Sequence, residues 1–154
     1  MSITLLKDVL IDTGMIENYY EGTVPTNLWR ALKKKSGLQV FEFVEEPFIL
    51  SNGRPRAADI QIKNKNGEKW VFIKERPRGV STFDKLGVPK GKNWEYIKIA
   101  KGTELPNGLA IVKDHYNAEF EATHYTIAPA YDMPLSQFKS KLAVLAENLM
   151  KKAI

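Results

Sequence analysis

Residues 122–133, ATHYTIAPAYDM, carry more information about this chain of 154 residues than any other stretch. Threonine, tyrosine and isoleucine favour β-strands, whereas proline interrupts a strand because it has no N–H group to donate. We therefore expect a late strand over residues 123–128 that ends at Pro129. The strand carries His124, one of the two histidines of the chain, which makes it a candidate place for chemistry.

A long amphipathic helix is expected directly after this strand. From Pro134 onward, apolar residues recur at steps of three and four, and Asp132 is available as an N-terminal cap. The recurring residues are Leu135, Phe138, Leu142, Leu145 and Leu149. Residues 2–12 also place apolar residues at helical spacing ahead of Gly14, so a short helix should open the chain.

The middle of the chain is predicted to be rich in strands. The segments ADIQIK (58–63) and KWVFIK (69–74) flank a connection that contains Asn66 and Gly67, which predicts a hairpin with a tight turn. Two further strands are expected at LQVFEFV (38–44), closed by Pro47, and at WEYIKI (94–99), before the apolar segment LAIV (109–112). Together these elements predict one α+β domain over residues 1–154 with a helix at each end.

Composition narrows the classes of protein that remain. With 44% hydrophobic and 27% charged residues the chain is globular, and the absence of cysteine excludes disulfides and thiolate metal sites. With only two histidines we expect no metal site. We find no membrane span and no secretory signal, so we expect a protein that starts in the cytoplasm. The net charge of +5 suits an anionic partner such as a dinucleotide, nucleic acid or an acidic protein, although dispersed lysines are also typical of a soluble surface.

The common catalytic signatures are missing, including the P-loop, the Gly-x-Ser-x-Gly elbow and the His-Glu-x-x-His zinc motif. What remains is a set of polar and aromatic residues near the ends of predicted strands. They are Arg30, Ser81, Thr82, Glu119, Glu121, His124 and Tyr125. From composition alone each residue also has an ordinary structural explanation, such as a turn hydroxyl or a hydrogen-bonded core histidine.

A family resemblance adds to this interpretation. It is carried, in chain order, by LWRA (28–31), RPRAADI (54–60), STFDKLGV (81–88), GTELPNGLAIVKD (102–114), KDHYNAEFE (113–121) and ATHYTIAPAYDM (122–133). These segments resemble the Tse-two family of effector toxins, which are exported by type VI secretion and are similar in fold to ADP-ribosyltransferases. Trp29 stands where that family has tyrosine, and neither residues 1 to about 25 nor the lysine-rich hairpin carries a resemblance.

The resemblance implies an ADP-ribosyltransferase-like split β-sandwich with NAD, as substrate, in a cleft between two small sheets. It places Arg30 on the first core strand, in contact with ribose and phosphate, for which the planar guanidinium is well suited. Ser81 and Thr82 would support the nicotinamide-side ribose, and Tyr125 would form an aromatic wall beside the ring. The strand at LWRA rests on the resemblance, because LWRALKKK by itself favours a helix.

The chain departs from the wider superfamily at one position. Most of these toxins carry a glutamate on the late strand a few residues before a proline, whereas this chain has His124 and Tyr125 there. Glu119 and Glu121 form a Glu-x-Glu pair just ahead of that strand. Two positions apart in a strand they would share a face, so that one carboxylate binds the sugar while the other activates an acceptor. Whether catalysis survives without the glutamate stays open at this point.

Two functions follow from these observations. The first is an NAD-dependent ADP-ribosyltransferase toxin that acts in the cytoplasm of a target cell on an unknown macromolecule, and that is neutralised in its producer by a cognate immunity protein. The alternative is a non-catalytic toxin or binding module on the same scaffold that engages nucleic acid or a translation component. The transferase hypothesis requires the Arg30 guanidinium, the hydroxyls of Ser81 and Thr82 and the His124 imidazole to meet around one hollow of nucleotide size.

Overall fold

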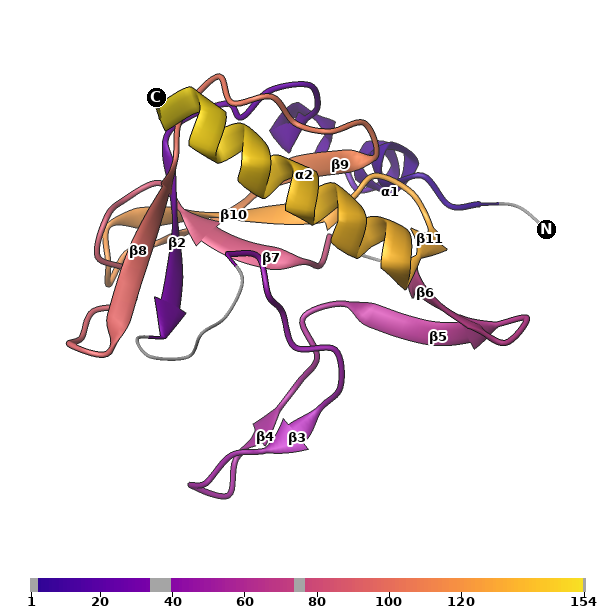
Figure 1. The fold of residues 1–154 in the computed structure, drawn as a ribbon, viewed down its shortest axis with the longest axis horizontal. Coiled ribbons are helices and arrows are strands. Elements are labelled where there is room, and N and C mark those ends of the chain that lie inside the picture. The colour runs from indigo at the N-terminus through magenta and orange to yellow at the C-terminus, as the bar shows by residue number, and fades with distance from the viewer. Residues whose placement is uncertain (1–2, 34–39, 74–76, 154) are drawn as a thin grey trace.

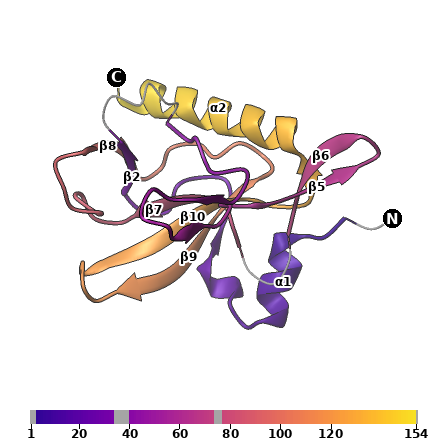
Figure 2. The same cartoon turned by 90° about the horizontal axis from the view of Figure 1, so that it is seen from below.

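The computed structural model describes residues 3–33, 40–73 and 77–153 as an α+β fold (Figure 1). Its main sheet has six strands in the order β1-β9-β10-β7-β2-β8. These are β1 (Tyr19–Tyr20), β9 (Leu109–Asn117), β10 (Ala122–Pro129), β7 (Val80–Phe83), β2 (Leu28–Lys33) and β8 (Trp94–Ile99). The helix α2 (Leu135–Ala153) lies over one side of this sheet, and α1 (Leu6–Asp12), followed by the short 3-10 helix η1 (Ile16–Asn18), lies on the other (Figure 2).

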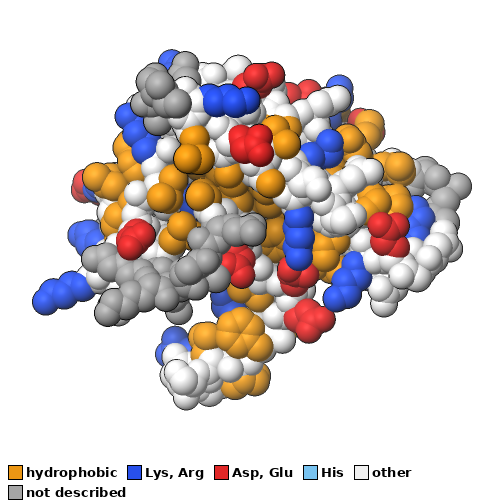
Figure 3. Space-filling model, in the orientation of Figure 1, with side chains coloured by type: hydrophobic (Ala, Val, Ile, Leu, Met, Phe, Trp, Pro, Cys, Tyr) orange, Lys and Arg blue, Asp and Glu red, His pale blue; other side chains and the backbone are white. Residues whose placement is uncertain are grey.

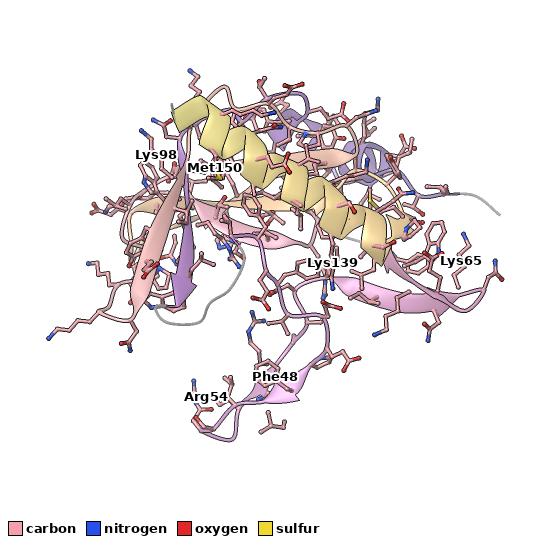
Figure 4. All side chains as sticks on the ribbon, viewed as in Figure 1. Phe48, Arg54, Lys65, Lys98, Lys139 and Met150 are labelled. Carbon is pink, nitrogen blue, oxygen red and sulfur yellow. The ribbon has the colours of Figure 1, made fainter. Side chains whose placement is uncertain are left out.

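Two smaller sheets complete the fold. One has three strands in the order β11-β6-β5, with β11 (Met133–Pro134), β6 (Glu68–Phe72) and β5 (Gln61–Lys65). The other consists of β3 (Phe48–Ile49) and β4 (Pro55–Arg56), which form a finger that projects from the body of the molecule (Figure 1). Apolar side chains cover much of this finger, and Phe48 at the start of β3 is 49% exposed (Figures 3 and 4).

Both predicted helices are present. The first begins at Leu6, later than the pattern over residues 2–12 suggested, and α2 buries Phe138 and Leu145 completely. The sequence suggested that Asp132 caps α2, but the structure shows otherwise. The Asp132 carboxylate accepts the backbone N–H groups of Thr4 (3.1 Å) and Ile73 (2.8 Å) instead. Within the described residues, no helix is long and apolar enough to cross a membrane.

The predicted hairpin and the predicted strand at residues 94–99 are confirmed as β5–β6 and β8. In the hairpin, Lys65 pairs with Glu68 across a two-residue turn in which Asn66 has a φ of 52° and Gly67 a φ of 80°. Positive φ at both positions is the geometry that matches the right-handed twist of a hairpin. The hairpin and its turn are thus confirmed, with strands at Gln61–Lys65 and Glu68–Phe72 where the sequence suggested residues 58–63 and 69–74.

The strand predicted over residues 38–44 is wrong in its described part, because residues 40–44 are irregular and the remainder lies outside the described residues. The aromatic residues of the segment nevertheless serve the core: Phe41 is 5% exposed, and the Phe43 ring lies 5.4 Å from that of Phe138. An aromatic run thus indicated burial correctly and secondary structure incorrectly, since the same side chains favour strands and fill cores.

The segment LWRA lies on a strand, as the resemblance implied. It belongs to β2, which pairs with β8 from Leu28↔Ile99 to Lys33↔Trp94. Leu28 and Ile99 are both fully buried. Tertiary pairing and burial therefore override the local helical preference of this segment.

The main sheet presents two different faces. On the α2 side, Ile111 and Ile127 belong to the larger apolar cluster together with Phe138. On the other side, Leu6 and Leu10 of α1 pack over Ala110, Val112 and Ala128. Every second side chain of these strands points to the α1 side. The row of such side chains is longer than the part that α1 covers, and the uncovered part can form a site.

A close backbone approach holds β7 against β10. A Cβ atom built on Gly79 would lie 2.0 Å from the carbonyl oxygen of Ile127, whereas one built on Gly53 would meet open space. Gly79→Ala should therefore lower the free energy of unfolding by roughly 3 kcal/mol. Gly53→Ala should cost only about 1 kcal/mol, because it forces alanine into a left-handed conformation. Chemical denaturation measures both values, and equal losses would contradict this explanation.

Candidate functional site

A row of polar side chains lies on the α1 side of the sheet, where β7, β10 and β9 run next to one another. In the ladders, Thr126 is opposite Ser81, and His124 is opposite both Phe83 and His115. Residues paired directly across strands share a face and stand close together. The ladder thus gathers two hydroxyls and two imidazoles on one face.

An irregularity in the β9–β10 ladder adds a carboxylate to this row. His124 pairs with His115 and Tyr125 pairs with Lys113, so Asp114 has no partner in the ladder. Such a bulge bends the strand and redirects a side chain. Asp114 Oδ2 lies 2.8 Å from His124 Nδ1 and also accepts a hydrogen bond from the Thr126 hydroxyl.

The His124 ring is held on three sides. The Phe83 ring meets it edge-on with the ring centroids 5.1 Å apart, and the His115 ring stacks on it at a centroid distance of 5.1 Å. The Asp114 carboxylate closes the third side, and the side chains of His124 and Asp114 are 15% and 20% exposed. The imidazole is therefore fixed in orientation while both side chains retain some access to solvent.

An open hollow of about 280 Å³ lies beside this row. Its floor is formed by Ser81, Asp114, His115 and Thr126, and its walls by residues 57–59 and 77–79. The wall contributes Asp59 and the exposed Arg78, so both signs of charge border the hollow. The hollow combines hydroxyl, carboxylate and imidazole groups with a guanidinium, which together can bind hydroxyl groups and an anion.

Thr82 and Tyr125 lie on the opposite face of the sheet, away from the row that contains Ser81 and His124. Thr82 is fully buried and donates its hydroxyl hydrogen to the carbonyl oxygen of Tyr125 at 2.9 Å, and Tyr125 is 7% exposed within the larger apolar cluster. Burial raises the pKa of the Tyr125 phenol. The expectation that Thr82 faces the same hollow as Ser81 is therefore wrong, because adjacent strand residues point to opposite faces.

Glu119 and Glu121 do not lie on one face of a strand, which corrects the geometry expected for the Glu-x-Glu pair. Both are exposed residues of the turn between β9 and β10, and Glu121 has a φ of 50°. Neither lines the hollow. A turn is needed at this point because the two strands are antiparallel neighbours.

Arg30 holds three segments together through its guanidinium. Nε donates to the carbonyl oxygen of Val40 at 3.3 Å, and the two terminal nitrogens donate to those of Ser81 at 3.1 Å and Glu42 at 2.7 Å. Desolvation lowers its pKa, an effect opposed by the nearby Asp59 carboxylate. Arg30 is not among the residues that line the hollow. It contacts the hollow's wall from behind, at the backbone carbonyl of Ser81, and it ties the irregular segment 40–42 to the sheet.

Sequence reasoning missed Asp114, Thr126 and His115. A signal was present, because pairing two antiparallel strands around residues 118–121 brings 113–117 opposite 122–125. Regular pairing alone would not have placed the Asp114 carboxylate against His124, since this contact depends on the bulge. Within the described residues, no group of three or more His, Asp or Glu side chains is arranged to hold a metal ion.

Comparison with known proteins assigns the chain to a class. Residues 11–154 match the family model described as Tse2 ADP-ribosyltransferase toxin, so the chain belongs to that family of bacterial toxins, and the resemblance seen in the sequence is confirmed. Among characterised relatives, Toxin Tse2 of Pseudomonas aeruginosa strain PAO1 is 36% identical over 76 residues. The matched region covers 49% of this chain and 45% of that protein.

Removing the Arg30 guanidinium should weaken the fold as well as the site. Arg30→Ala leaves three backbone carbonyls without their donor, so we expect a loss of roughly 2–3 kcal/mol in the free energy of unfolding. For a chain of this size that corresponds to a fall in Tm of roughly 5–10 °C. Arg54→Ala, which removes an exposed arginine of the β3–β4 finger, is the matched control and should leave Tm unchanged. A Tm of Arg30→Ala equal to that of the control would show that these contacts contribute nothing.

Proposed function

We propose that the protein is an NAD-dependent ADP-ribosyltransferase toxin that acts in the cytoplasm of a target cell and modifies a macromolecule there. Membership of the toxin family over residues 11–154 supports the reaction class. The observation that carries the proposal is the hollow lined by Ser81, Asp114, His115 and Thr126. His124 does not line it but lies next to it, hydrogen-bonded to Asp114 and stacked on His115. The hollow offers hydroxyl, carboxylate and imidazole groups to one small ligand.

The reaction fits these groups. The bond between nicotinamide and C1′ of the ribose breaks, and nicotinamide leaves with the bonding electrons. Positive charge then develops on the sugar, as in glycoside hydrolysis, so acceptor and negative groups stabilise the transition state. A nucleophile of the target forms the new bond to C1′ and releases its proton to solvent. In this proposal Ser81 and His124 bind the ribose hydroxyls, while the Asp114 carboxylate supplies negative charge.

The phosphates of NAD need donors at the edge of the same hollow. Arg78 lines the wall and is exposed, and Arg30 keeps some of its five N–H donors after its three carbonyl contacts. We place the pyrophosphate against Arg78, with Arg30 contributing through its remaining donors. Thr82 and Tyr125 act from the opposite face, where their mutual hydrogen bond fixes the spacing of β7 and β10.

The biological setting follows from the toxin class. We propose delivery by type VI secretion and a cognate immunity protein that covers the hollow in the producing cell. An acidic partner surface would complement the net charge of +5. In this proposal the exposed glutamates Glu119 and Glu121 on the β9–β10 turn face the target macromolecule and activate its nucleophile, which accepts the ADP-ribose.

Transfer of label from NAD tests the proposal. Target-cell lysate is incubated with adenylate-labelled NAD and either the wild type or the variants Ser81→Ala and His124→Ala, and both protein labelling and nicotinamide release are measured. Each variant should lower transfer by about 100-fold, the usual contribution of one positioned polar group. Ser51→Ala, which changes an exposed serine in the turn between β3 and β4, is the matched control and should retain full activity.

The outcomes separate the two functions. Absence of both label transfer and nicotinamide release in the wild type, with toxicity retained, would contradict the transferase. Binding of nucleic acid that weakens by about one log unit per log of salt for each neutralised phosphate would then favour the non-catalytic alternative. Full activity of His124→Ala would leave the reaction class intact and remove His124 from the site.

A further inference from the structure

We propose that Asp114 is the positioning residue of this site: it holds His124 in the tautomer that carries its proton on Nδ1 and leaves Nε2 free to accept a hydrogen bond from a ribose hydroxyl. This inference rests on the proposed function for the identity of the ligand. The tautomer itself follows from the geometry of the chain alone.

The direction of each hydrogen bond is fixed by chemistry. An ionised carboxylate only accepts hydrogen bonds, so the 2.8 Å contact between Asp114 Oδ2 and His124 Nδ1 requires a proton on Nδ1. The Thr126 hydroxyl donates to the same oxygen. Two donors therefore converge on Oδ2 and hold the carboxylate in place. A neutral imidazole that carries its proton on Nδ1 has its lone pair on Nε2.

The surroundings of the ring prevent the alternative arrangement. A half-turn of the imidazole would replace Nδ1 by a carbon atom at Asp114 and lose a charge-assisted hydrogen bond. The rings of Phe83 and His115 pack against His124 and restrict its rotation. Within the described residues no side chain or backbone group hydrogen-bonds to Nε2, and the His124 side chain is 15% exposed. We therefore assign Nε2 as the atom that accepts from the ligand.

The origin of the arrangement is the bulge. Asp114 reaches His124 because it has no ladder partner between the pairs His124↔His115 and Tyr125↔Lys113. In a regular ladder, neighbouring residues point to opposite faces, so the side chains of Asp114 and His115 could not both lie on the face of His124. The carboxylate thus lies close behind the imidazole, where its negative charge also favours a cationic sugar bound at Nε2. This is the logic by which a buried carboxylate orients a catalytic histidine in other enzymes.

The tautomer can be measured directly by long-range ¹H–¹⁵N correlation spectra of protein labelled at histidine. In alkaline buffer, where imidazole is neutral, the wild type should show His124 with Nδ1 protonated. Asp114→Asn should lose this single tautomer, because a carboxamide can both donate and accept. Asp12→Asn, which removes an exposed carboxylate at the end of α1, is the control and should leave the spectrum unchanged. A His115→Gln sample assigns the two histidines, and thermal unfolding confirms that each variant is folded.

Activity provides the second measurement. Asp114→Asn should lower kcat for NAD cleavage by about 100-fold or more, with a smaller effect on KM, because it removes the negative charge that favours the cationic sugar of the transition state. A wild-type spectrum with Nε2 protonated, or Asp114→Asn cleaving NAD at the wild-type rate, would overturn the positioning role. A locked tautomer in a protein that cleaves no NAD would support the positioning of His124 and overturn only the proposed transferase.

Discussion

The bulge between β9 and β10 is the constraint on which the candidate site depends. A regular antiparallel ladder would offer hydroxyls and imidazoles on the α1 side of the sheet, but it would not direct a carboxylate toward them. The unpaired Asp114 supplies this carboxylate and hydrogen-bonds both His124 and Thr126. The polar row then becomes a connected network with defined donors and acceptors, which is what an electrostatic site requires.

The two faces of the sheet have different roles: one is buried and supports the strands, and the other carries the candidate site. On the α2 side, Tyr125 and Thr82 are buried and linked by a hydrogen bond, so they keep β7 and β10 at a fixed spacing. On the α1 side, Ser81 and Thr126 stand directly opposite each other on the same two strands. A change on the buried face therefore acts on the site through strand geometry. Arg30 extends this support because it joins Ser81 to the irregular segment 40–42.

Local chemistry predicted those elements whose structure is set by nearby residues. The turn at Asn66 and Gly67, the alternation over residues 94–99 and the leucine spacing of α2 all gave correct elements. The aromatic run at residues 40–44 misled, because its residues are buried by contacts from α2 and have their carbonyls satisfied by Arg30 rather than by a strand. Neither contact has a signature in the local sequence.

The site was predictable only in part for the same reason. His124 and Ser81 follow from the motifs, and antiparallel pairing indicates their common face. Asp114 was visible in the motif KDHYN, but its role depends on one extra residue in a ladder, which residue preferences do not reveal. For Glu119 and Glu121 the sequence predicted too much. Their spacing suggested one face of a strand, but both residues lie in a turn.

Titration of NAD into ¹⁵N-labelled protein, followed through the backbone amide signals, shows whether the hollow over Ser81, Asp114 and Thr126 receives NAD. The largest shifts should fall on residues 57–59, 77–79, 81, 114–115 and 126, which line the hollow. Signals of the β5–β6 hairpin should stay unchanged. Shifts centred on that hairpin, or no shifts at millimolar NAD, would contradict the account.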